Sequence, residues 1–485
     1  MHGFETITKA LERFIGGPTT KTKTAMVDNP IDEARRLVAE GAAGRGGEFA
    51  ARTRAADVAL FYSSADDSSR IALFEELEKI GPSMAQLMEA ASTLIEADDE
   101  PKIAAEKIEK LRSALASPRE RVLSGFATIP HGVEILVRMR GELLSRKESA
   151  FRGLEADLGR LLSSWFDPGL LEIRRVDWNS GASVLERLIR YEAVHPVVSW
   201  DDIRNRLAED RRCFALFHPR MPGDPLAFVE VALTKGIAGD VSAILDVDAA
   251  ENDPKDADTA IFYSITNAHE GLRGIPLGEH LIRKATGELA KELPWIKTFS
   301  TLSPIPGLVS GILSMTDEEG RTLVGGVWDE IVPLAREISA INPHRIGDPA
   351  AMARMAAGVS EFRSPIIVLA AHHLTSLDAN GRPIDPVARF HLRNGGRIER
   401  LNWLGDPSPK GMRQSLGVMA NYLYDPTRLE RRHEMLVSER KVERSAEIDA
   451  ILGAGEEPRK KSIGRRILDA GMVKRNAAKP RKNEG

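Results

Sequence analysis

The sequence predicts a helical domain followed by an α/β domain, and three observations support this fold class. The chain has 485 residues, more than a single domain usually holds. From about Asn29 to Phe166, apolar residues recur every three to four positions, as in amphipathic helices. After residues 165–169 (WFDPG), short β-like runs alternate with helical segments, as in α/β domains. The expected segments are a flexible N-terminus at 1–25, a helical domain at 26–166, an α/β domain at 167–455 and a basic, disordered tail at 456–485.

The helical domain is expected to be a bundle of helices with short loops. Two helix starts follow from their capping residues: Asp28 or Asn29 before Pro30, and Ser83 before Met84. The periodic segments are 28–43, 69–81, 83–97 and 131–149.

The α/β domain is expected to contain strands and helices in alternation. Predicted strands lie at 170–178, 212–219, 225–234, 259–267 and 296–305, and predicted helices at 182–194 and 279–293. Residues 220–224 (RMPGD) join two of these strands and favour a hairpin. The region from Gly311 to Arg363 is predicted to be a helical insertion. Segment 390–403 is predicted to be strand-like, with a turn at Asn394-Gly395.

Composition excludes several classes of protein. The only cysteine is Cys213, so no intrachain disulfide, two-cysteine redox motif or cysteine-based metal cluster can form. The net charge of −4 and the aromatic content of 5% do not favour nucleic-acid binding. No apolar stretch is long enough to span a membrane. The first fifteen residues could form an amphipathic helix but do not resemble a secretory signal, and the last four, KNEG, are not a peroxisomal address. We therefore expect a cytoplasmic, bacterial protein.

Common catalytic motifs are missing from the sequence. It contains no GxSxG, GxxxxGK[ST], GxGxxG or HExxH pattern, which disfavours a conventional serine hydrolase, kinase, dehydrogenase or zinc enzyme. The pair His372-His373 has no nearby carboxylates in sequence and is expected to be structural. We therefore predict no metal site.

One loop has the composition of a pyrophosphate-binding site. Residues 273–282, RGIPLGEHLI, follow a predicted strand and begin a predicted helix. Such a junction offers free N–H groups and the positive helix end to an anion, and glycines let a phosphate approach the backbone. The segment resembles the RGxGIGxxLL loop with which acetyltransferase-fold proteins bind coenzyme A, although Pro276 stands where that pattern usually has glycine. The alternative is a purely structural strand–helix turn.

Four segments, taken in order, resemble the malonyl-CoA decarboxylase family. They are EAVHPVVSWDDIRNRL, NAHEGLRGIPLGEHLI, FSTLSPIPGL and VARFHLRNGGRIERLNWLGDPSPKGMRQSLGVMANYLY. The resemblance covers roughly residues 165–425, and the LSPIPG and FHLxNG signatures are specific together. It implies a helical oligomerisation domain and a catalytic domain of the acetyltransferase (GNAT) superfamily.

The resemblance also implies site residues. Ser303 of LSPIPG corresponds to a proton acceptor or substrate-binding residue, and His391 of FHLxNG to the proton donor. Malonyl-CoA would be bound by these two residues and by the loop Arg273, Gly274, Ile275, Pro276, Leu277, Gly278 and Glu279. Pro276 replaces an acidic residue of some relatives, so no acidic role carries over there. The linking cysteines of some animal relatives are absent, so a homo-oligomer, dimer or tetramer, would be non-covalent.

The chemistry implied needs no cofactor, because coenzyme A belongs to the substrate itself. Loss of CO2 from malonyl-CoA leaves an enolate conjugated with the thioester carbonyl. The protein must orient the carboxylate, stabilise the charge on the thioester oxygen and deliver a proton to C2. A histidine such as His391 suits proton delivery, because its reference pKa lies near neutrality. Ser303 could bind the carboxylate, bind the thioester oxygen or relay a proton.

Other residues and other functions stay open at this point. Asn421, Tyr422 and Tyr424 are further candidates for lining the pocket, and Tyr263 and His269 are weaker ones. The alternative functions are a coenzyme A-dependent acyltransferase of the same fold and a non-catalytic scaffold that binds coenzyme A.

Overall fold

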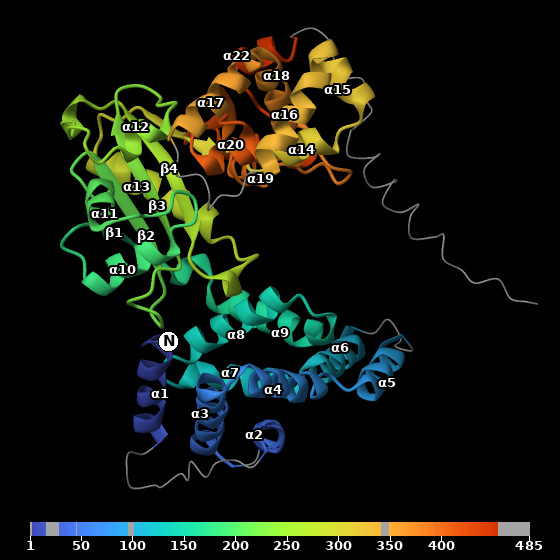
Figure 1. Ribbon diagram of the computed structural model, residues 1–485. Coiled ribbons are helices and arrows are strands. Elements are labelled where there is room, and N and C mark those ends of the chain that lie inside the picture. The colour runs from blue at the N-terminus through green and yellow to red at the C-terminus, as the bar shows by residue number, and fades with distance from the viewer. Residues whose placement is uncertain (1, 16–28, 45, 96–100, 341–348, 454–485) are drawn as a thin grey trace, which may run out of the picture. The chain divides into compact units, whose positions relative to one another are not determined.

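The computed structural model describes residues 2–15, 29–44, 46–95, 101–340 and 349–453 (Figure 1). The chain forms two compact units. The first comprises Met1–Glu172, Leu216–Ala227 and Asn267–Leu277, and the second comprises Ile173–Ala215, Phe228–Thr266 and Gly278–Gly485. The predicted tail at 456–485 lies outside the described residues. Among the described residues, no helix combines the length and apolar character needed to cross a membrane.

The first unit is helical, as predicted. Its helices are α1 (His2–Ile15), α2 (Pro30–Ala43), α3 (Glu48–Ser64), α4 (Asp67–Lys79), α5 (Met84–Ile95), α6 (Pro101–Leu115), α7 (Pro118–Ser124), α8 (Gly132–Arg146) and α9 (Arg152–Trp165). The start of α2 is confirmed, because the Asn29 side chain accepts a hydrogen bond from the N–H of Ile31.

Residues 2–15, part of the segment expected to be a flexible N-terminus, are helical. These residues form α1, the amphipathic helix that the sequence allowed, and its Ile7 and Leu11 are buried. Burial of this apolar face against other helices stabilises a segment whose composition alone looks polar. Residues 16–25 lie outside the described residues.

The boundary between the predicted domains is more complex than a single cut near residue 167. The first unit continues to Glu172 and includes two later segments, 216–227 and 267–277. One reason is a hydrogen bond of 3.1 Å between His218 Nε2 and the carbonyl oxygen of Trp165. The two segments are chain excursions between strands, so they pack with the helices although they follow the boundary in sequence.

The second unit is built on a mixed sheet, whose strands alternate with helices in sequence as predicted. The strands of its described residues are β1 (Glu172–Val176), β2 (Arg211–Phe217), β3 (Ala227–Thr234), β4 (Thr259–Asn267), β5 (Thr298–Thr301), β6 (Ser303–Pro304), β7 (Arg397–Asn402) and β8 (Met419–Tyr424). Their order is β1-β2-β3-β4-β5-β8-β6, with β7 also paired to β8. β4 and β5 are parallel, whereas β8 runs antiparallel to β5, β6 and β7.

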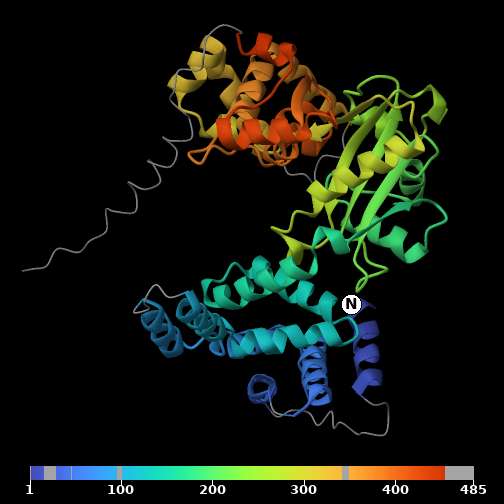
Figure 2. The same ribbon diagram turned by 180° about the vertical axis from the view of Figure 1, so that it is seen from behind.

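Helices cover the sheet and extend beyond it. They are α10 (Ala182–Tyr191), α11 (Trp200–Arg206), α12 (Val241–Leu245), α13 (Leu277–Glu292), α14 (Leu308–Ser314), α15 (Asp317–Val324), α16 (Trp328–Ala340), α17 (Pro349–Ser360), α18 (Arg363–Thr375), α19 (Pro386–Arg393), α20 (Pro409–Ser415), α21 (Leu429–Glu439) and α22 (Ala446–Ile451). Figure 2 shows α13 lying along one face of the sheet. The predicted helical region between Gly311 and Arg363 is confirmed for its described residues.

The prediction of a strand at 390–403 is wrong in its first part. Residues 386–393 form α19, and only Arg397–Asn402 form a strand, β7. The Asp385 carboxylate accepts hydrogen bonds from the N–H groups of Val387 and Ala388, and Pro386 takes the first helical position. These are ordinary helix-start signals, and they place His391 on a helix instead of a strand. The predicted turn is present, because Gly395 has a φ of +76°.

An apolar cluster on the sheet fixes the strand end that carries Ser303. Its buried members are Ala232, Val241, Ile244, Ile261, Tyr263, Leu302 and Met419. Leu302 belongs to this cluster, and neighbouring side chains of an extended chain point to opposite sides. Ser303 and Thr301 therefore point together to the other side.

Candidate active site

Ser303 and His391, which lie 88 positions apart in sequence, are joined by a hydrogen bond. Ser303 Oγ lies 3.0 Å from His391 Nε2. Ser303 begins β6 and His391 lies in the last turn of α19, and both side chains are buried. The structure thus brings together the two residues to which the sequence assigned the chemistry.

The hydrogen-bonded chain extends at both ends of this pair. Ser303 Oγ lies 2.9 Å from Thr301 Oγ1, and His391 Nδ1 lies 2.9 Å from the hydroxyl of Tyr424. We call these four residues the Ser303–His391 chain. No member of it carries a formal charge while the imidazole is neutral.

The hydrogen atoms along the Ser303–His391 chain can be arranged in two directions. In one, Tyr424 donates to Nδ1 and the Nε2–H group donates to Ser303. In the other, Ser303 donates to Nε2 and the Nδ1–H group donates to Tyr424. Both arrangements satisfy a neutral imidazole.

The surroundings of His391 strongly favour its neutral form. Burial lowers the pKa of His391 to about 3, and the charge of Asp385 opposes this shift only in part. Burial also raises the pKa values of Tyr422 and Tyr424. The ring of Tyr422 stacks on the imidazole, with 4.5 Å between ring centroids and 26° between the planes.

Asp385 connects the two chain segments that carry the pair. Its carboxylate caps α19 and also accepts a hydrogen bond of 3.3 Å from the N–H of Gly307, in the loop that follows Ser303. His373 lies beside it, with 3.6 Å between Nε2 and the Asp385 carboxylate. A Cβ added to Gly307 would lie 2.9 Å from His373 Nε2, so glycine is needed for this close packing. His373 is therefore a buried neighbour of the site.

Asn421 and Tyr422, two of the residues expected to line the substrate pocket, have different surroundings. Both N–H bonds of the Asn421 amide are used, because Nδ2 donates to the carbonyl oxygens of Ala238 and Thr301. Asn421 therefore binds backbone and has no free donor for a substrate. The Tyr422 hydroxyl is buried and has no hydrogen-bond partner among the described residues.

The two weaker candidates are not part of the Ser303–His391 chain. Tyr263 is buried in the apolar cluster beneath the sheet. His269 belongs to the first unit, where its Nε2 lies 3.6 Å from the Asp224 carboxylate.

The predicted pyrophosphate loop lies where the chain passes from the first unit to the second. Residues 273–277 belong to the first unit, and Gly278 and Glu279 belong to the second. Arg273, Gly274 and Pro276 are exposed, whereas Ile275, Leu277 and Gly278 are buried. Gly274 has a φ of +88° and open space where a Cβ would lie. Its glycine is required by the backbone conformation.

Gly278 also has a packing reason to be glycine, which the sequence analysis did not anticipate. A Cβ there would lie 2.8 Å from the ring of Phe390, the neighbour of His391. Close packing against α19 requires glycine at position 278, whether or not a phosphate also approaches its backbone. Substitution of Gly278 would therefore also disturb His391, and Gly274 is the better position for testing the loop.

The sequence analysis missed Thr301 and Asp385. Thr301 lies two positions before Ser303 and therefore on the same side of the extended chain, a signal that period-two spacing offers. Asp385 precedes Pro386, which is the helix-start signal overlooked in the strand prediction.

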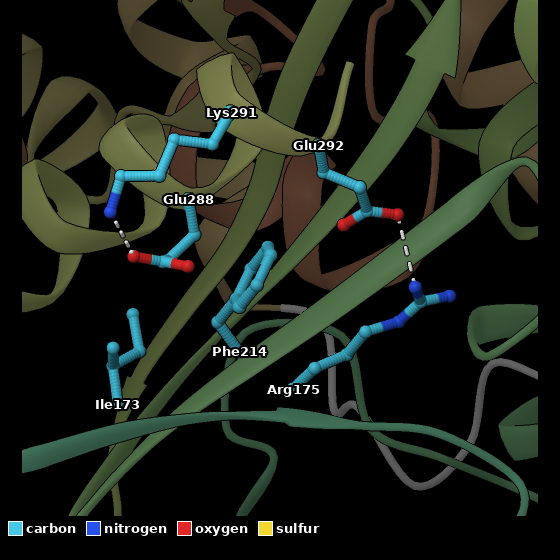
Figure 3. A pocket seen from close by; sticks show the side chains of 6 residues that line it. All are labelled: Ile173, Arg175, Phe214, Glu288, Lys291 and Glu292. Atoms are coloured by element: carbon cyan, nitrogen blue, oxygen red, sulfur yellow. Dashed lines mark hydrogen bonds and ion pairs between the residues drawn. The ribbon is translucent and has the colours of Figure 1, made fainter.

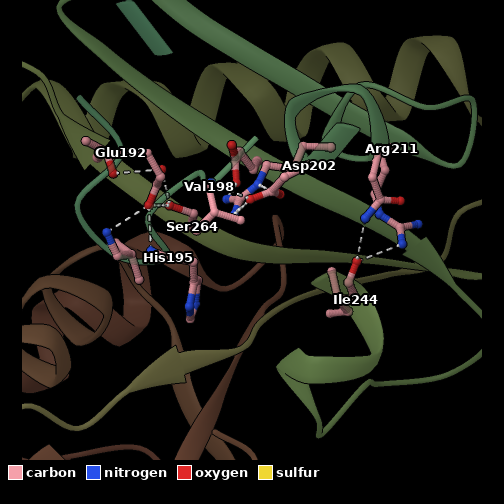
Figure 4. A network of polar contacts seen from close by, with 12 residues as sticks. Glu192, His195, Val198, Asp202, Arg211, Ile244 and Ser264 are labelled. Carbon is pink, nitrogen blue, oxygen red and sulfur yellow. Dashed lines mark hydrogen bonds and ion pairs between the residues drawn. The ribbon is translucent and has the colours of Figure 1, made fainter. Parts of the chain in front are cut away.

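A second buried polar network lies elsewhere in the second unit (Figure 4). The Glu192 carboxylate accepts hydrogen bonds from the N–H groups of Val194 and His195 and from the hydroxyls of Ser264 and Thr266. Close by in sequence, the Arg206 guanidinium bonds the carboxylates of Asp202 at 2.7 Å and Glu230 at 2.9 Å. We call Glu192, Asp202, Arg206, Glu230 and their partners the Arg206 network.

A pocket of about 350 Å³ is lined by a different set of residues (Figure 3). Its lining residues are Ile173, Arg175, Phe214, Glu288, Lys291 and Glu292. The charged groups pair with one another, Arg175 with Glu292 at 3.0 Å and Lys291 with Glu288 at 2.9 Å. No residue of the Ser303–His391 chain lines it. In the described part of the chain, no group of three or more histidine, cysteine or acidic side chains is arranged to hold a metal ion.

A mixed sheet with helices and a buried, uncharged chain of serine, histidine and tyrosine describes a class of α/β proteins with a site suited to proton transfer. Comparison with known families narrows this class. Residues 169–462 match the malonyl-CoA decarboxylase C-terminal domain, and residues 80–166 match the malonyl-CoA decarboxylase N-terminal domain. The chain belongs to the malonyl-CoA decarboxylase family.

Similar proteins and structures agree with this assignment. Mitochondrial malonyl-CoA decarboxylase of Rattus norvegicus is 31% identical over 393 residues, covering 77% of this chain and 80% of the rat protein. The protein of the same name from Anser anser anser is 36% identical, and the match spans 64% of its length. Crystal structures of malonyl-CoA decarboxylase from Rhodopseudomonas palustris (35% identity) and Agrobacterium vitis (34%) each give a TM-score of 0.74, covering 87% of this chain and 99% of the other.

Proposed function

We propose that this chain converts malonyl-CoA to acetyl-CoA and CO2, with Ser303 and His391 as its catalytic pair. The observation that carries the assignment of the pair is their hydrogen bond of 3.0 Å in a chain of the malonyl-CoA decarboxylase family. The α/β part is proposed to be a catalytic domain of the acetyltransferase superfamily. The loop Arg273–Glu279, ahead of most of helix α13, would bind the pyrophosphate of coenzyme A.

The reaction needs one proton for each turnover. The C–C bond to the carboxylate breaks, its electrons pass into the thioester as an enolate, and CO2 leaves. The enolate carbon then takes a proton to become the methyl group of acetyl-CoA. Charge on the thioester oxygen must be stabilised by hydrogen-bond donors during this step.

His391 would supply the proton, although it is neutral in the free chain. A negative carboxylate or enolate beside a histidine raises its pKa, because it favours the charged imidazolium. Entry of the substrate would therefore oppose the effect of burial that lowers the pKa of His391 to about 3. Since Ser303 Oγ is hydrogen-bonded to His391 Nε2, the proton could reach C2 through the serine hydroxyl. Binding of the carboxylate or of the thioester oxygen are the other roles open to Ser303.

We propose that no metal or organic cofactor takes part, because the thioester itself accepts the electrons. Activity should survive chelation with EDTA followed by exhaustive dialysis. Recovery of a lost activity by an added metal or cofactor would contradict this proposal.

We also propose that the chain forms a non-covalent dimer or tetramer and acts in the cytoplasm, in fatty acid metabolism. Support for an assembly comes from the helical hairpin α5–α6, where large apolar side chains are exposed. These are Met84, Met88, Ile95, Ile108 and Leu115. Cys213 is buried, so it is not placed to link subunits. Light scattering of the purified chain with and without reductant should give the same mass, larger than one subunit.

The deciding experiment incubates the purified chain with malonyl-CoA and follows acetyl-CoA and CO2. Both products should appear in equal amounts. Transfer of an acyl group to an added amine, without CO2, would favour an acyltransferase. Binding of coenzyme A without any product would favour a non-catalytic scaffold.

A further inference from the structure

The segment that leads into the pyrophosphate loop packs directly on a helix of the helical region. The short helix η6 (Glu270–Leu272) lies against α8, within the first unit. A Cβ at Gly271 would lie 1.8 Å from the carbonyl oxygen of Val137, and a Cβ at Gly141 would lie 3.2 Å from the Gly271 nitrogen. The two backbones therefore touch, and this contact requires glycine at position 271.

Arg140 holds this contact with hydrogen bonds to the loop backbone. Its Nη1 donates to the carbonyl oxygens of Gly271 at 2.8 Å and Arg273 at 2.9 Å. The same side chain pairs with Glu155 at 2.9 Å and is only 11% exposed. A buried guanidinium whose charge is paired on one side can thus bind two peptide carbonyls on the other.

The orientation of one peptide group follows from this arrangement. In a trans peptide the C=O and N–H bonds point in opposite directions. Because the Arg273 carbonyl points to Arg140, the N–H of Gly274 points away from it. This N–H has no hydrogen-bond acceptor within the described residues, and Gly274 is exposed. It is therefore a free donor, facing outward at the start of the predicted pyrophosphate loop.

We propose that Arg140 is a positioning residue for substrate binding: it fixes the peptide before Gly274 so that the loop is preset for the pyrophosphate of coenzyme A. The inference rests on the proposed function of the loop. The helical region then has a part in substrate affinity, in addition to any part in assembly. Preset donors bind an anion without the cost of ordering the loop at that moment.

The test compares two substrates with the Arg140→Met variant. Malonyl-CoA carries the pyrophosphate, and malonyl-pantetheine carries the same reacting group without it. The variant should raise KM for malonyl-CoA about tenfold or more, since hydrogen bonds from a charged group are lost. Its kcat/KM for malonyl-pantetheine should stay within about twofold, because the reacting centre is separate. The dissociation constant of free coenzyme A, measured by calorimetry, should rise with KM.

Two further variants separate this role from a merely structural one. Arg146→Met changes another arginine of α8, which pairs with Glu142 at 2.8 Å, and should leave both substrates unaffected. Arg140→Lys keeps the charge but not the planar fork of the guanidinium. It replaces the methionine variant if that variant does not fold, and it should raise KM for malonyl-CoA, by a smaller factor, without changing kcat/KM for malonyl-pantetheine.

The possible outcomes lead to distinct conclusions. Equal losses on both substrates, or no change in KM for malonyl-CoA, would overturn the role of Arg140. A wild-type chain that leaves malonyl-CoA intact would instead refute the proposed function, and the calorimetric arm with free coenzyme A would still decide whether Arg140 presets the loop.

Discussion

The second unit contains two buried polar networks that solve the problem of burial in opposite ways. In the Arg206 network, a guanidinium is buried among carboxylates: Arg206 is 2% exposed and lies between Asp202 and Glu230. In the Ser303–His391 chain the groups are equally buried, but they are neutral, and no ion pair touches the imidazole nitrogens. The Arg206 guanidinium already has two carboxylate partners, whereas the imidazole of His391 has only neutral ones.

This difference supports the proposal that the Ser303–His391 chain, and not the Arg206 network, performs the chemistry. A paired buried charge is fixed, because losing either partner leaves the other uncompensated. A neutral imidazole with a low pKa is poised to change its charge, because any nearby anion favours its protonated form.

The largest expected effect comes from breaking the Ser303–His391 chain at its centre. General acid–base catalysis contributes about 100- to 10,000-fold, so His391→Asn should lose that much of kcat, and Ser303→Ala should also be strongly impaired. Affinity for coenzyme A should be largely kept, because the pyrophosphate loop is a separate element. If both residues serve one step, the double variant should be little worse than the poorer single variant. Near-normal turnover of His391→Asn, measured by release of CO2, would refute the assignment.

The second effect comes from breaking the Arg206 network. Arg206→Met should lower the free energy of unfolding by about 3 kcal/mol, because two buried carboxylates lose their partner. This value is at the low end of the range for breaking a buried ion pair, which is about 3 to 5 kcal/mol. Burial and the charge of Glu192 raise the pKa of Glu230 to about 8, so Glu230 can take a proton when Arg206 is lost and need not remain as an unpaired charge. Activity per folded molecule should be unchanged.

A matched control for this variant is Arg36→Met. Arg36 bonds Glu33 and Glu40 on the surface of α2, with a side chain that is 51% exposed. Denaturant unfolding should show a loss of no more than about 1 kcal/mol. Similar losses for the two arginines would mean that the buried ion pairs of Arg206 contribute no more to the free energy of unfolding than the surface ion pairs of Arg36.

The third effect is a dependence of stability on pH. The pKa of His391 is about 3 in the folded chain and near the ordinary histidine value of 6.5 when the chain is unfolded. Between these values the unfolded chain binds more protons, so stability should fall as pH falls through this window, by up to about 1.4 kcal/mol per pH unit from this group. His391→Asn should show a shallower decline. Parallel curves for the two proteins would show that His391 is not held neutral.

The smallest effect distinguishes the two tyrosines beside the imidazole. Tyr424→Phe removes the hydrogen bond of 2.9 Å to Nδ1 and should lower kcat about fivefold, as expected for one hydrogen bond of roughly 1 kcal/mol. Tyr422→Phe removes a hydroxyl without a partner in the described residues, so stability should not fall. A large loss of kcat/KM for Tyr422→Phe with unchanged stability would assign its hydroxyl to substrate binding.

Several features of this protein were determined by the sequence itself. Three-to-four periodicity predicted the helices of residues 29–166, and alternating runs predicted the strands from β1 to β5, because both patterns are local. The LSPIPG and FHLxNG signatures pointed to Ser303 and His391 before any distance was known. A capping pattern at Asp385-Pro386 would also have given α19, had it been weighed against the strand-like composition that follows.

Other features were decided only by the tertiary structure. The pairing of Ser303 with His391, the neutral state of that histidine and its contact with Tyr424 depend on chain segments far apart in sequence. The same holds for Arg140, whose place in a helical pattern says nothing of the two carbonyls it binds more than 130 positions later. Local patterns report which face of an element is apolar. Burial, charge pairing and pKa arise when distant elements exclude water together. This is why the sequence could name the candidate residues Ser303 and His391 but not their protonation state.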